Sequence, residues 1–365
     1  MQKTNEHIAI VLGTRPEIIK QSPIIRECLD RDISYSLIHT GQHYSDDLDS
    51  VFFSQLELPE PNYHLGVGSG THGKQTGEMI ARIEEVLQNE EPTHVLVQGD
   101  TNTVLAGAIA ASKLPTKIGH IEAGLRSFNR EMPEETNRVL TDHVSDYLFT
   151  PTESSKQHLL NEGIQAERIY VTGNTIVDAV EQNIDLAREK SGILNTLSIE
   201  QDDFMLLTAH RAENVDSATR FESLLEGVAK LSKRQGVPVV YPVHPRSREK
   251  IETFGIDIPE QITAIEPLNF LDFLILEDTA QLVLTDSGGV QEETSILHTP
   301  CVTLRDETER PETIDVGANE IAGINPESIL QAGIKMLEQR RGWENPYGDG
   351  TASKQIIDIL CSDNE

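Results

Sequence analysis

The sequence predicts an α/β protein of two domains, each built on a doubly wound parallel sheet. The chain has 365 residues, which fits two domains of about 150–200 residues better than one. Short apolar runs alternate with helical patterns along its whole length. These runs are apolar throughout rather than at every second residue, which is typical of strands buried on both faces.

Each half of the chain predicts one sheet. Strand-like runs in the first half lie at 8–12, 35–40, 94–98, 117–121, 146–150 and 168–172, with helical patterns such as 76–88 and 154–163 between them. Those of the second half lie at 204–210, 238–244, 262–266, 281–286 and 300–304. Such alternation predicts parallel strands joined by crossover helices. We therefore expect domains at 1–185 and 195–345, linked through 176–194, and a C-terminal helix, 350–365, packed back on the first domain.

The charge balance argues against nucleic-acid binding. The chain carries 60 acidic and 30 basic residues, a net charge of −30, and lacks a basic patch. An ordinary acidic protein is one interpretation. A salt-rich cytosol is the sharper one, since self-repulsion is tolerated when the Debye length falls to about 3 Å near 1 M salt. If the protein is halophilic, its melting temperature is expected to depend on the KCl concentration.

The remaining composition points to the cytoplasm. Cys28, Cys301 and Cys361 are far apart and form no CxxC pattern, as expected of reduced thiols. No apolar run approaches the ~18 residues of a membrane helix, and the first apolar run is too short for a signal peptide. We expect a cytoplasmic protein without a membrane segment.

Acidic residues follow two consecutive strands. Asp100 follows the run "HVLVQG", and Glu122 follows "KIGHI". Consecutive strands are neighbours about two times in three, and ligands of open α/β sheets bind at the carboxyl ends of strands. Both carboxylates are therefore expected at one site between the two domains.

Two strand–turn–helix patterns favour phosphate. In "GTRPEIIK", Arg15 and Lys20 flank a helix start that attracts anions, although a solvated helix start is the alternative. In "TDSGGVQEE", backbone N–H groups of the stretch 287–289 suit a pyrophosphate, and Glu292 or Glu293 suits ribose hydroxyls. A simple capping turn with dipole-stabilised acids is the alternative here.

Other polar residues at strand ends and helix starts each have a functional and a structural interpretation. His210 in "TAHRAEN" suits a phosphate contact or a polar loop, and His244 in "PVHPRS" is as easily structural. Of Arg305 and Arg310, one is expected to be structural. The paired acids of "MPEETNR" are either functional or dipole-stabilised residues of a helix start.

Nicotinamide and metal chemistry are not expected. "GSGTHG" (68–73) matches G-x-G-x-x-G but does not follow the first strand, and a lone match is weak. His39 and His43 are separated by a strand end and Gly41, which breaks the spacing of a helical metal pair. The combination of a diphosphate site with carboxylates predicts acid–base chemistry on the sugar of a nucleotide sugar.

Eight motifs together resemble the non-hydrolysing UDP-N-acetylglucosamine 2-epimerases. They are "GTRPEIIK", "QGDTNT", "HIEAGLRS", "PEETNR", "TGNTIVD", "TAHRAEN", "TDSGGVQEE" and "TERPE", in family order across residues 8–361. The resemblance implies two Rossmann-like domains of the GT-B type facing across a cleft. It implies reversible exchange of UDP-N-acetylglucosamine and UDP-N-acetylmannosamine through elimination and re-addition of UDP, with 2-acetamidoglucal between them, no redox cofactor, and a homodimer.

The resemblance also assigns residues. It gives proton handling to Asp100, Glu122 and Glu134, and it counts His210, a diphosphate contact, among the catalytic residues. It gives the substrate contacts and the orientation of the acids to Arg15, Lys20, Arg138, Phe273, Ser287, Gly288, Gly289, Glu293 and Arg310. His244, which follows a predicted strand, is expected among the substrate-binding residues as well. Which acid removes the proton and which returns it stays open.

The chain departs from the bacterial members at two places. "LRSFNREMPEE" is shorter than their stretch and resembles an archaeal type, and "GQHYSDD" replaces the "QHR" segment of their activator site, which leaves activation open. A modified substrate such as a diacetamido uronic acid nucleotide is one alternative. A hydrolysing 2-epimerase, a GT-B glycosyltransferase and a non-catalytic sensor of nucleotide sugars are the others.

Overall fold

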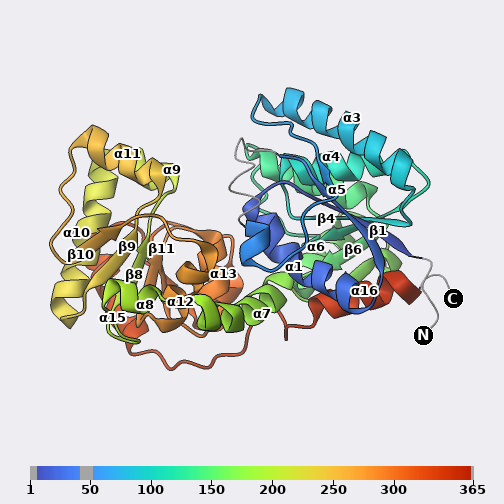
Figure 1. Cartoon of the computed structure of the whole chain (residues 1–365). Helices are drawn as coiled ribbons and strands as arrows, with labels where there is room; N and C mark the ends of the chain where they lie inside the picture. The colour runs from blue at the N-terminus through green and yellow to red at the C-terminus, as the bar shows by residue number, and fades with distance from the viewer. Residues whose placement is uncertain (1–5, 42–51, 363–365) are drawn as a thin grey trace. The chain divides into compact units, whose positions relative to one another are not determined.

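The computed structural model describes residues 6–41 and 52–362, which form two compact units (Figure 1). One consists of Met1–Gln182 and Tyr347–Glu365, and the other of Asn183–Pro346. Each unit has its own parallel sheet, which confirms the predicted class of two doubly wound α/β domains. That the domains face each other across a cleft stays a prediction.

The sheet of the first unit has seven strands in the order β3-β2-β1-β4-β5-β6-β7, and every pair is parallel. Its central strands are buried on both faces, as their apolar sequences predict. The two-residue edge strand β3 was not predicted, because so short a strand has no sequence pattern. The strands are β1 (His7–Leu12), β2 (Ser34–His39), β3 (Tyr63–His64), β4 (His94–Gln98), β5 (Lys117–Ile121), β6 (Tyr147–Thr150) and β7 (Ile169–Val171).

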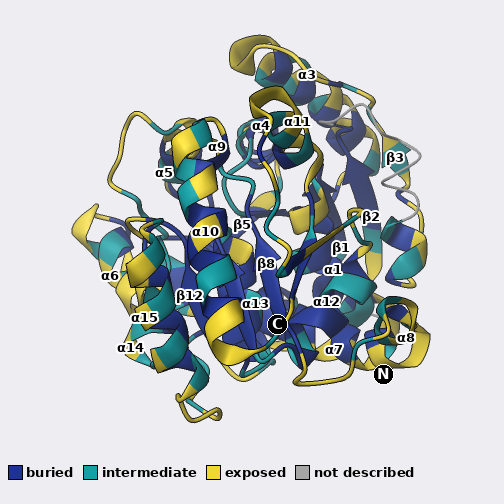
Figure 2. Cartoon of the chain, turned by 90° about the vertical axis from the view of Figure 1, so that its left-hand side faces the viewer, coloured by how far each residue is buried: buried dark blue, intermediate teal, exposed yellow. Residues whose placement is uncertain are grey.

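Helices cover both faces of this sheet. In Figure 1, α3, α4 and α5 lie on one side of the strands, and α1 and α16 lie on the other. Figure 2 shows buried strands beneath helices whose outer faces are exposed. The helices are α1 (Arg15–Asp30), α3 (His72–Glu90), α4 (Asn102–Ala111), α5 (Pro133–Val144), α6 (Glu153–Asn161), the 3-10 turn η1 (Ala166–Arg168), α7 (Thr175–Lys190), which leads into the second unit, and α16 (Ala352–Ser362).

The C-terminal helix α16 belongs to the first unit, where it packs against α1. Asp178 on α7 fixes its start by accepting hydrogen bonds from the backbone N–H and the hydroxyl of Ser353, at 2.9 and 2.6 Å. Asn174 also donates a backbone hydrogen bond to the carbonyl of Tyr347 at 2.8 Å. The chain therefore returns to the first unit through defined polar contacts.

The sheet of the second unit has six parallel strands in the order β10-β9-β8-β11-β12-β13. A core of aliphatic side chains, with Phe221 and Tyr241 as its aromatic members, fills the space between strands and helices. The short edge strand β13 was not predicted either. The strands are β8 (Met205–Thr208), β9 (Val239–Pro242), β10 (Ile262–Ile265), β11 (Leu282–Thr285), β12 (Cys301–Thr303) and β13 (Asn319–Ile321).

Eight helices of the second unit alternate with these strands. They are α8 (Ile193–Leu197), α9 (Ala212–Val215), α10 (Ala218–Gln235), α11 (Pro245–Phe254), α12 (Phe270–Thr279), α13 (Gly288–Ile296), α14 (Pro311–Asp315) and α15 (Pro326–Leu337). Within residues 6–41 and 52–362, no helix has the length and apolar character to span a bilayer.

Candidate active site

The strand order of the first unit reverses between β1 and β4, the position at which open α/β sheets bind ligands. The turn after β1 requires Gly13, because an added Cβ would lie 2.1 Å from the hydroxyl of Thr40 and 2.4 Å from that of Thr103. Helix α1 begins at Arg15, directly after this turn. Asp100 follows β4, so both predicted features stand at the same edge of the sheet.

Glu122 stands beside Asp100 on the neighbouring strand. Gln98 of β4 pairs with Ile121 of β5, and the two acids follow these residues directly or after one glycine. An added Cβ on that glycine, Gly99, would lie 3.8 Å from Oε2 of Glu122. Glu122 itself has a φ of 68°, which is uncommon for a residue with a side chain and typical of strain at functional sites. The predicted adjacency of the two strand ends that carry these acids is therefore found.

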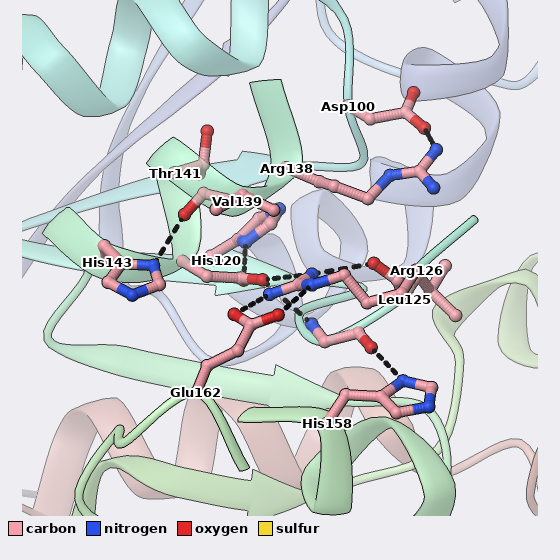
Figure 3. Close-up of polar contacts among 12 residues, drawn as sticks. Asp100, His120, Leu125, Arg126, Arg138, Val139, Thr141, His143, His158 and Glu162 are labelled. Atoms are coloured by element: carbon pink, nitrogen blue, oxygen red, sulfur yellow. Dashed lines mark hydrogen bonds and ion pairs between the residues drawn. The ribbon is translucent and has the colours of Figure 1, made fainter. Parts of the chain in front are cut away.

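Each of these carboxylates contacts one cation. The ammonium of Lys20 on α1 lies 2.5 Å from Oε1 of Glu122, and both side chains are largely buried. Arg138 on α5 donates a hydrogen bond to Asp100, as Figure 3 shows. It also donates to Glu135 at 3.0 Å, which fixes the guanidinium from a second side. Lys20 and Arg138 therefore fix the positions of the two carboxylates.

The paired acids at the start of α5 differ in their surroundings. Glu135 is buried and accepts hydrogen bonds from the backbone and hydroxyl of Ser127 and the backbone of Phe128, at 2.9 to 3.0 Å. Glu134 is exposed and makes no hydrogen bond or ion pair with the described residues. Glu135 thus holds the loop before the helix, and Glu134 is left for another partner.

A cluster of buried polar side chains holds the carboxyl ends of β4 and β5 in place (Figure 3). Nδ1 of His120 lies 2.7 Å from Asp142, and its Nε2 lies 2.8 Å from the carbonyl of Gly99. Asp142 also pairs with Arg126 at 2.7 Å, and Arg126 pairs in turn with Glu162. His120 therefore ties β5 to the residue before the first of the two acids.

Glu17, for which the sequence predicts no role at the site, lies at the start of α1 beside these residues. It is 4% exposed and accepts hydrogen bonds from the backbones of Gly13 and Thr14 and from the hydroxyl of Thr101, at 2.6, 3.0 and 2.5 Å. Burial raises its pKa from 4.5 to about 7, and Asp100 contributes to the increase. Glu17 links the turn after β1 to the loop after β4.

Asp286 has the corresponding place in the second unit, whose strand order reverses between β8 and β11. It is fully buried and accepts hydrogen bonds from the backbones of His210 and Arg211 at 3.0 Å. The side-chain amide of Asn214 donates to it as well, at 3.1 Å. Asp286 therefore joins the "TAHRAEN" loop to the "TDSGG" turn, a role that the sequence does not predict.

Helix α13 begins with an open turn. Ser287 is its N-cap, and the N–H groups of a first helical turn have no acceptor within the helix. An added Cβ on Gly288 meets no described atom within 4 Å, and on Gly289 it meets only the hydroxyl of Ser287 at 3.9 Å. Packing within the described residues does not require these glycines, and the predicted approach of an anion to this turn is sterically open.

The rings of His210 and His244 lie together, with their centroids 5.3 Å apart. Burial lowers the pKa of His210, and Arg211 and Arg246 lower it further against the opposing charge of Asp286. Nδ1 of His244 accepts a hydrogen bond from the backbone of Arg246 at 3.2 Å and caps α11. This cap gives His244 a structural role, and its contact with substrate stays a prediction.

The remaining predicted residues of the second unit lie on its helices. Phe273 is half-buried on α12, and Glu293 lies on α13, one residue after Glu292. Glu292 is buried and accepts a hydrogen bond from Arg310. Arg305 is 5% exposed and pairs with Glu213 and Glu309, so it is the structural member of the arginine pair.

The structure brings the predicted residues together within each unit. Lys20 contacts Glu122, and Arg138 contacts Asp100, so they form two pairs at the ends of the adjacent strands β5 and β4. Arg15 is the first residue of α1, and its guanidinium lies 5.5 Å from the ring centroid of Phe52. The "GQHYSDD" stretch lies almost wholly outside the described residues. Within the described residues, no three His, Cys, Asp or Glu side chains are arranged to hold a metal ion.

Known proteins resemble this chain over nearly its whole length. A curated UDP-N-acetylglucosamine 2-epimerase of Methanocaldococcus jannaschii is 51% identical over 97% of this chain and 98% of its own. The crystal structure of the M. jannaschii UDP-GlcNAc 2-epimerase in complex with UDP-GlcNAc and UDP superposes with a TM-score of 0.87 at 51% identity, over 97% of this chain and 99% of that one. The UDP-2,3-diacetamido-2,3-dideoxy-D-glucuronate 2-epimerase of Pseudomonas aeruginosa is 42% identical over 97% of this chain and 99% of its own.

The family model described as UDP-N-acetylglucosamine 2-epimerase matches residues 26–361. This match includes the whole second sheet and all strands of the first sheet except β1. The chain belongs to the UDP-N-acetylglucosamine 2-epimerase family.

Proposed function

We propose that this chain interconverts UDP-N-acetylglucosamine and UDP-N-acetylmannosamine by eliminating UDP and adding it back. The observation that carries the proposal is the pair of carboxylates at adjacent strand ends, Asp100 and Glu122, each held by its own cation. The family membership supplies the reaction class. The pair supplies what the C2 inversion needs, which is two positioned proton-transfer groups.

The C2 proton is not next to a carbonyl, so simple deprotonation is out of reach. In the proposed step a carboxylate takes the C2 proton, and the C–H electron pair forms the C1–C2 double bond. The C1–O bond breaks, and its electrons remain on the β-phosphate of UDP. The products are UDP and 2-acetamidoglucal, so no atom is lost and no redox cofactor takes part.

The return step inverts C2. A protonated carboxyl delivers a proton to the opposite face of C2 while the β-phosphate oxygen attacks C1. Asp100, Glu122 and Glu134 are the proposed proton-handling residues, and the exposed carboxylate of Glu134 has no competing partner among the described residues. Lys20 and Arg138 are proposed to orient Glu122 and Asp100.

The second unit is proposed to retain UDP while the sugar changes. Ser287, Gly288 and Gly289 offer the N–H groups of a helix start to the diphosphate, which is where negative charge develops. Arg15, His210, His244 and Arg310 are proposed to add polar contacts to the nucleotide or sugar. Phe273 is proposed to lie near the base, and Glu293 to accept from the ribose hydroxyls.

A modified nucleotide sugar is the second candidate substrate. The Pseudomonas aeruginosa relative at 42% identity acts, by its name, on a diacetamido glucuronate nucleotide. The same C2 chemistry serves either sugar, so the difference lies in contacts to C3 and C6. Turnover of both nucleotides in parallel reactions decides between them.

We also propose a cytoplasmic, salt-adapted homodimer. All three cysteines are free thiols, which fits a reducing compartment, and a net charge of −30 fits a salt-rich one of the archaeal type. Sedimentation in high KCl tests the dimer: a monomer at micromolar protein concentration would contradict it.

The deciding experiment follows UDP-N-acetylglucosamine by NMR in D2O with high KCl. We expect deuterium at C2 together with the mannosamine nucleotide. Release of free N-acetylmannosamine would indicate a hydrolysing enzyme, and transfer to an acceptor without C2 exchange would indicate a glycosyltransferase. UDP binding without turnover would indicate a non-catalytic sensor of nucleotide sugars. The control variant is Glu131→Gln, which removes the charge of an exposed acid close to Glu134 and should keep full exchange of the C2 proton.

A further inference from the structure

Glu277 on α12 is a buried acid that the proposed chemistry does not use. Its side chain is fully buried, and neither carboxyl oxygen has a hydrogen-bond donor among the described residues. A buried carboxylate is stable only with a cation or with several donors. Glu277 has neither, so its environment favours the neutral acid.

The group that Glu277 meets is the carboxylate of Glu293 on α13. Burial, and then the charge of Glu293, raise the pKa of Glu277 well above 4.5. The thiol of Cys301 on β12 also interacts with Glu277, and burial raises the pKa of this thiol to about 12, so it is neutral as well. Two carboxylates are both acceptors, and they bind each other only when one carries a proton.

We infer that Glu277 keeps its proton at neutral pH and positions Glu293 by donating a hydrogen bond to it. Glu277 is the member that holds the proton, because it is the fully buried one, whereas Glu293 is partly exposed and keeps the charge. One oxygen of Glu293 then accepts from Glu277, which restricts the orientation of the carboxylate. This role rests on the proposed function, in which Glu293 accepts from the ribose.

The inference makes Glu277 a positioning residue for ribose recognition. A short-range O–H···O⁻ bond is among the stronger hydrogen bonds of proteins, so it restricts the rotation of Glu293. An apolar residue at 277 would fill the same buried space, but it would leave Glu293 free to turn. Nucleotide affinity would then lose its dependence on the ribose hydroxyl before it lost the diphosphate contacts.

An infrared difference spectrum tests the proton directly. At about pH 8, where ordinary carboxyls are ionised, the wild-type protein should show a C=O stretching band of a protonated carboxyl that is absent from Glu277→Gln. Asp278→Asn, which changes the neighbouring acid of the same helix, should keep the band. Identical spectra for the wild type and Glu277→Gln would overturn the inference.

Calorimetric titration with UDP and 2′-deoxy-UDP tests the positioning. Wild type, Glu277→Gln and Asp278→Asn should bind UDP about tenfold more tightly than 2′-deoxy-UDP, the effect of one hydrogen bond to a charged acceptor. Glu277→Leu should reduce this ratio to near one. A general structural defect would weaken both nucleotides equally, and that outcome, or an unchanged ratio in Glu277→Leu, would overturn the positioning role. If the folded wild type bound neither nucleotide, the proposed function would fail, while the infrared result would still decide the proton.

Discussion

Glu17→Gln tests the buried acid of the first unit. The carboxyl is almost fully buried, and its pKa is raised from 4.5 to about 7. Since the pKa is raised on folding, the contribution of the neutral acid to stability is complete below pH 4.5 and is lost as the pH rises to about 7. This displacement of the pKa corresponds to about 3 kcal/mol of unfolding free energy. Glutamine stays neutral and can still accept from Gly13 and Thr14.

The assay is urea unfolding of both proteins at constant KCl between about pH 5.5 and 8.5, above the isoelectric point of about 4.7. The free-energy difference in favour of Glu17→Gln should grow by about 2 kcal/mol up to pH 7 and then level off. Glu153→Gln, at the exposed start of α6, should show no such trend. A difference that stays constant over this range would refute the argument that burial outweighs the three hydrogen bonds. Glu17 interacts with Asp100, so the titration of Glu17 should affect turnover. We therefore expect the pH profile of kcat to change near pH 7 in the wild type and to lack this change in Glu17→Gln.

Four further outcomes follow from the same contacts. Glu122→Gln should lower C2 exchange in D2O at least about 100-fold and leave UDP binding within about twofold by calorimetry. Asp286→Ala removes the acceptor of two backbone N–H groups and of the buried Asn214 amide, so it should destabilise the second unit by about 3–5 kcal/mol in urea unfolding. Asp178→Ala should cost about 1–2 kcal/mol and speed limited proteolysis ahead of α16 if the cap at Ser353 holds that helix. The melting temperature should rise with KCl, and a flat curve would end the salt hypothesis.

The strands and their ends could be predicted because parallel strands buried on both faces are apolar throughout. Asp100 and Glu122 were placed correctly beside each other for this reason, since two such strands paired in sequence order. The edge strands β3 and β13 could not be predicted, because two or three residues show no periodicity.

Burial of single acids could not be predicted either. The sequence shows Glu17 only as an acid in a first helical turn, whereas its surroundings come from Thr101, 84 positions later. Glu134 and Glu135 look equivalent in sequence, and only the loop at Ser127 distinguishes them. Glu277 lies in a helix without any motif, so no local pattern could indicate that it is buried against Glu293.

The two units solve the same physical problem in the same way. In an open parallel sheet, the two strands at the reversal of strand order lead into separate loops, whose backbone N–H groups and side chains must be held in fixed positions to bind a charged ligand. Glu17 joins the loops after β1 and β4, and Asp286 joins those after β8 and β11. In both units, a buried carboxylate accepts the N–H groups at the start of one loop and is connected to the other. Donors fixed in this way need no reorganisation when charge develops on a departing phosphate or a proton leaves carbon. Loss of either carboxylate should therefore reduce the rate of turnover more than it reduces the binding of the nucleotide sugar.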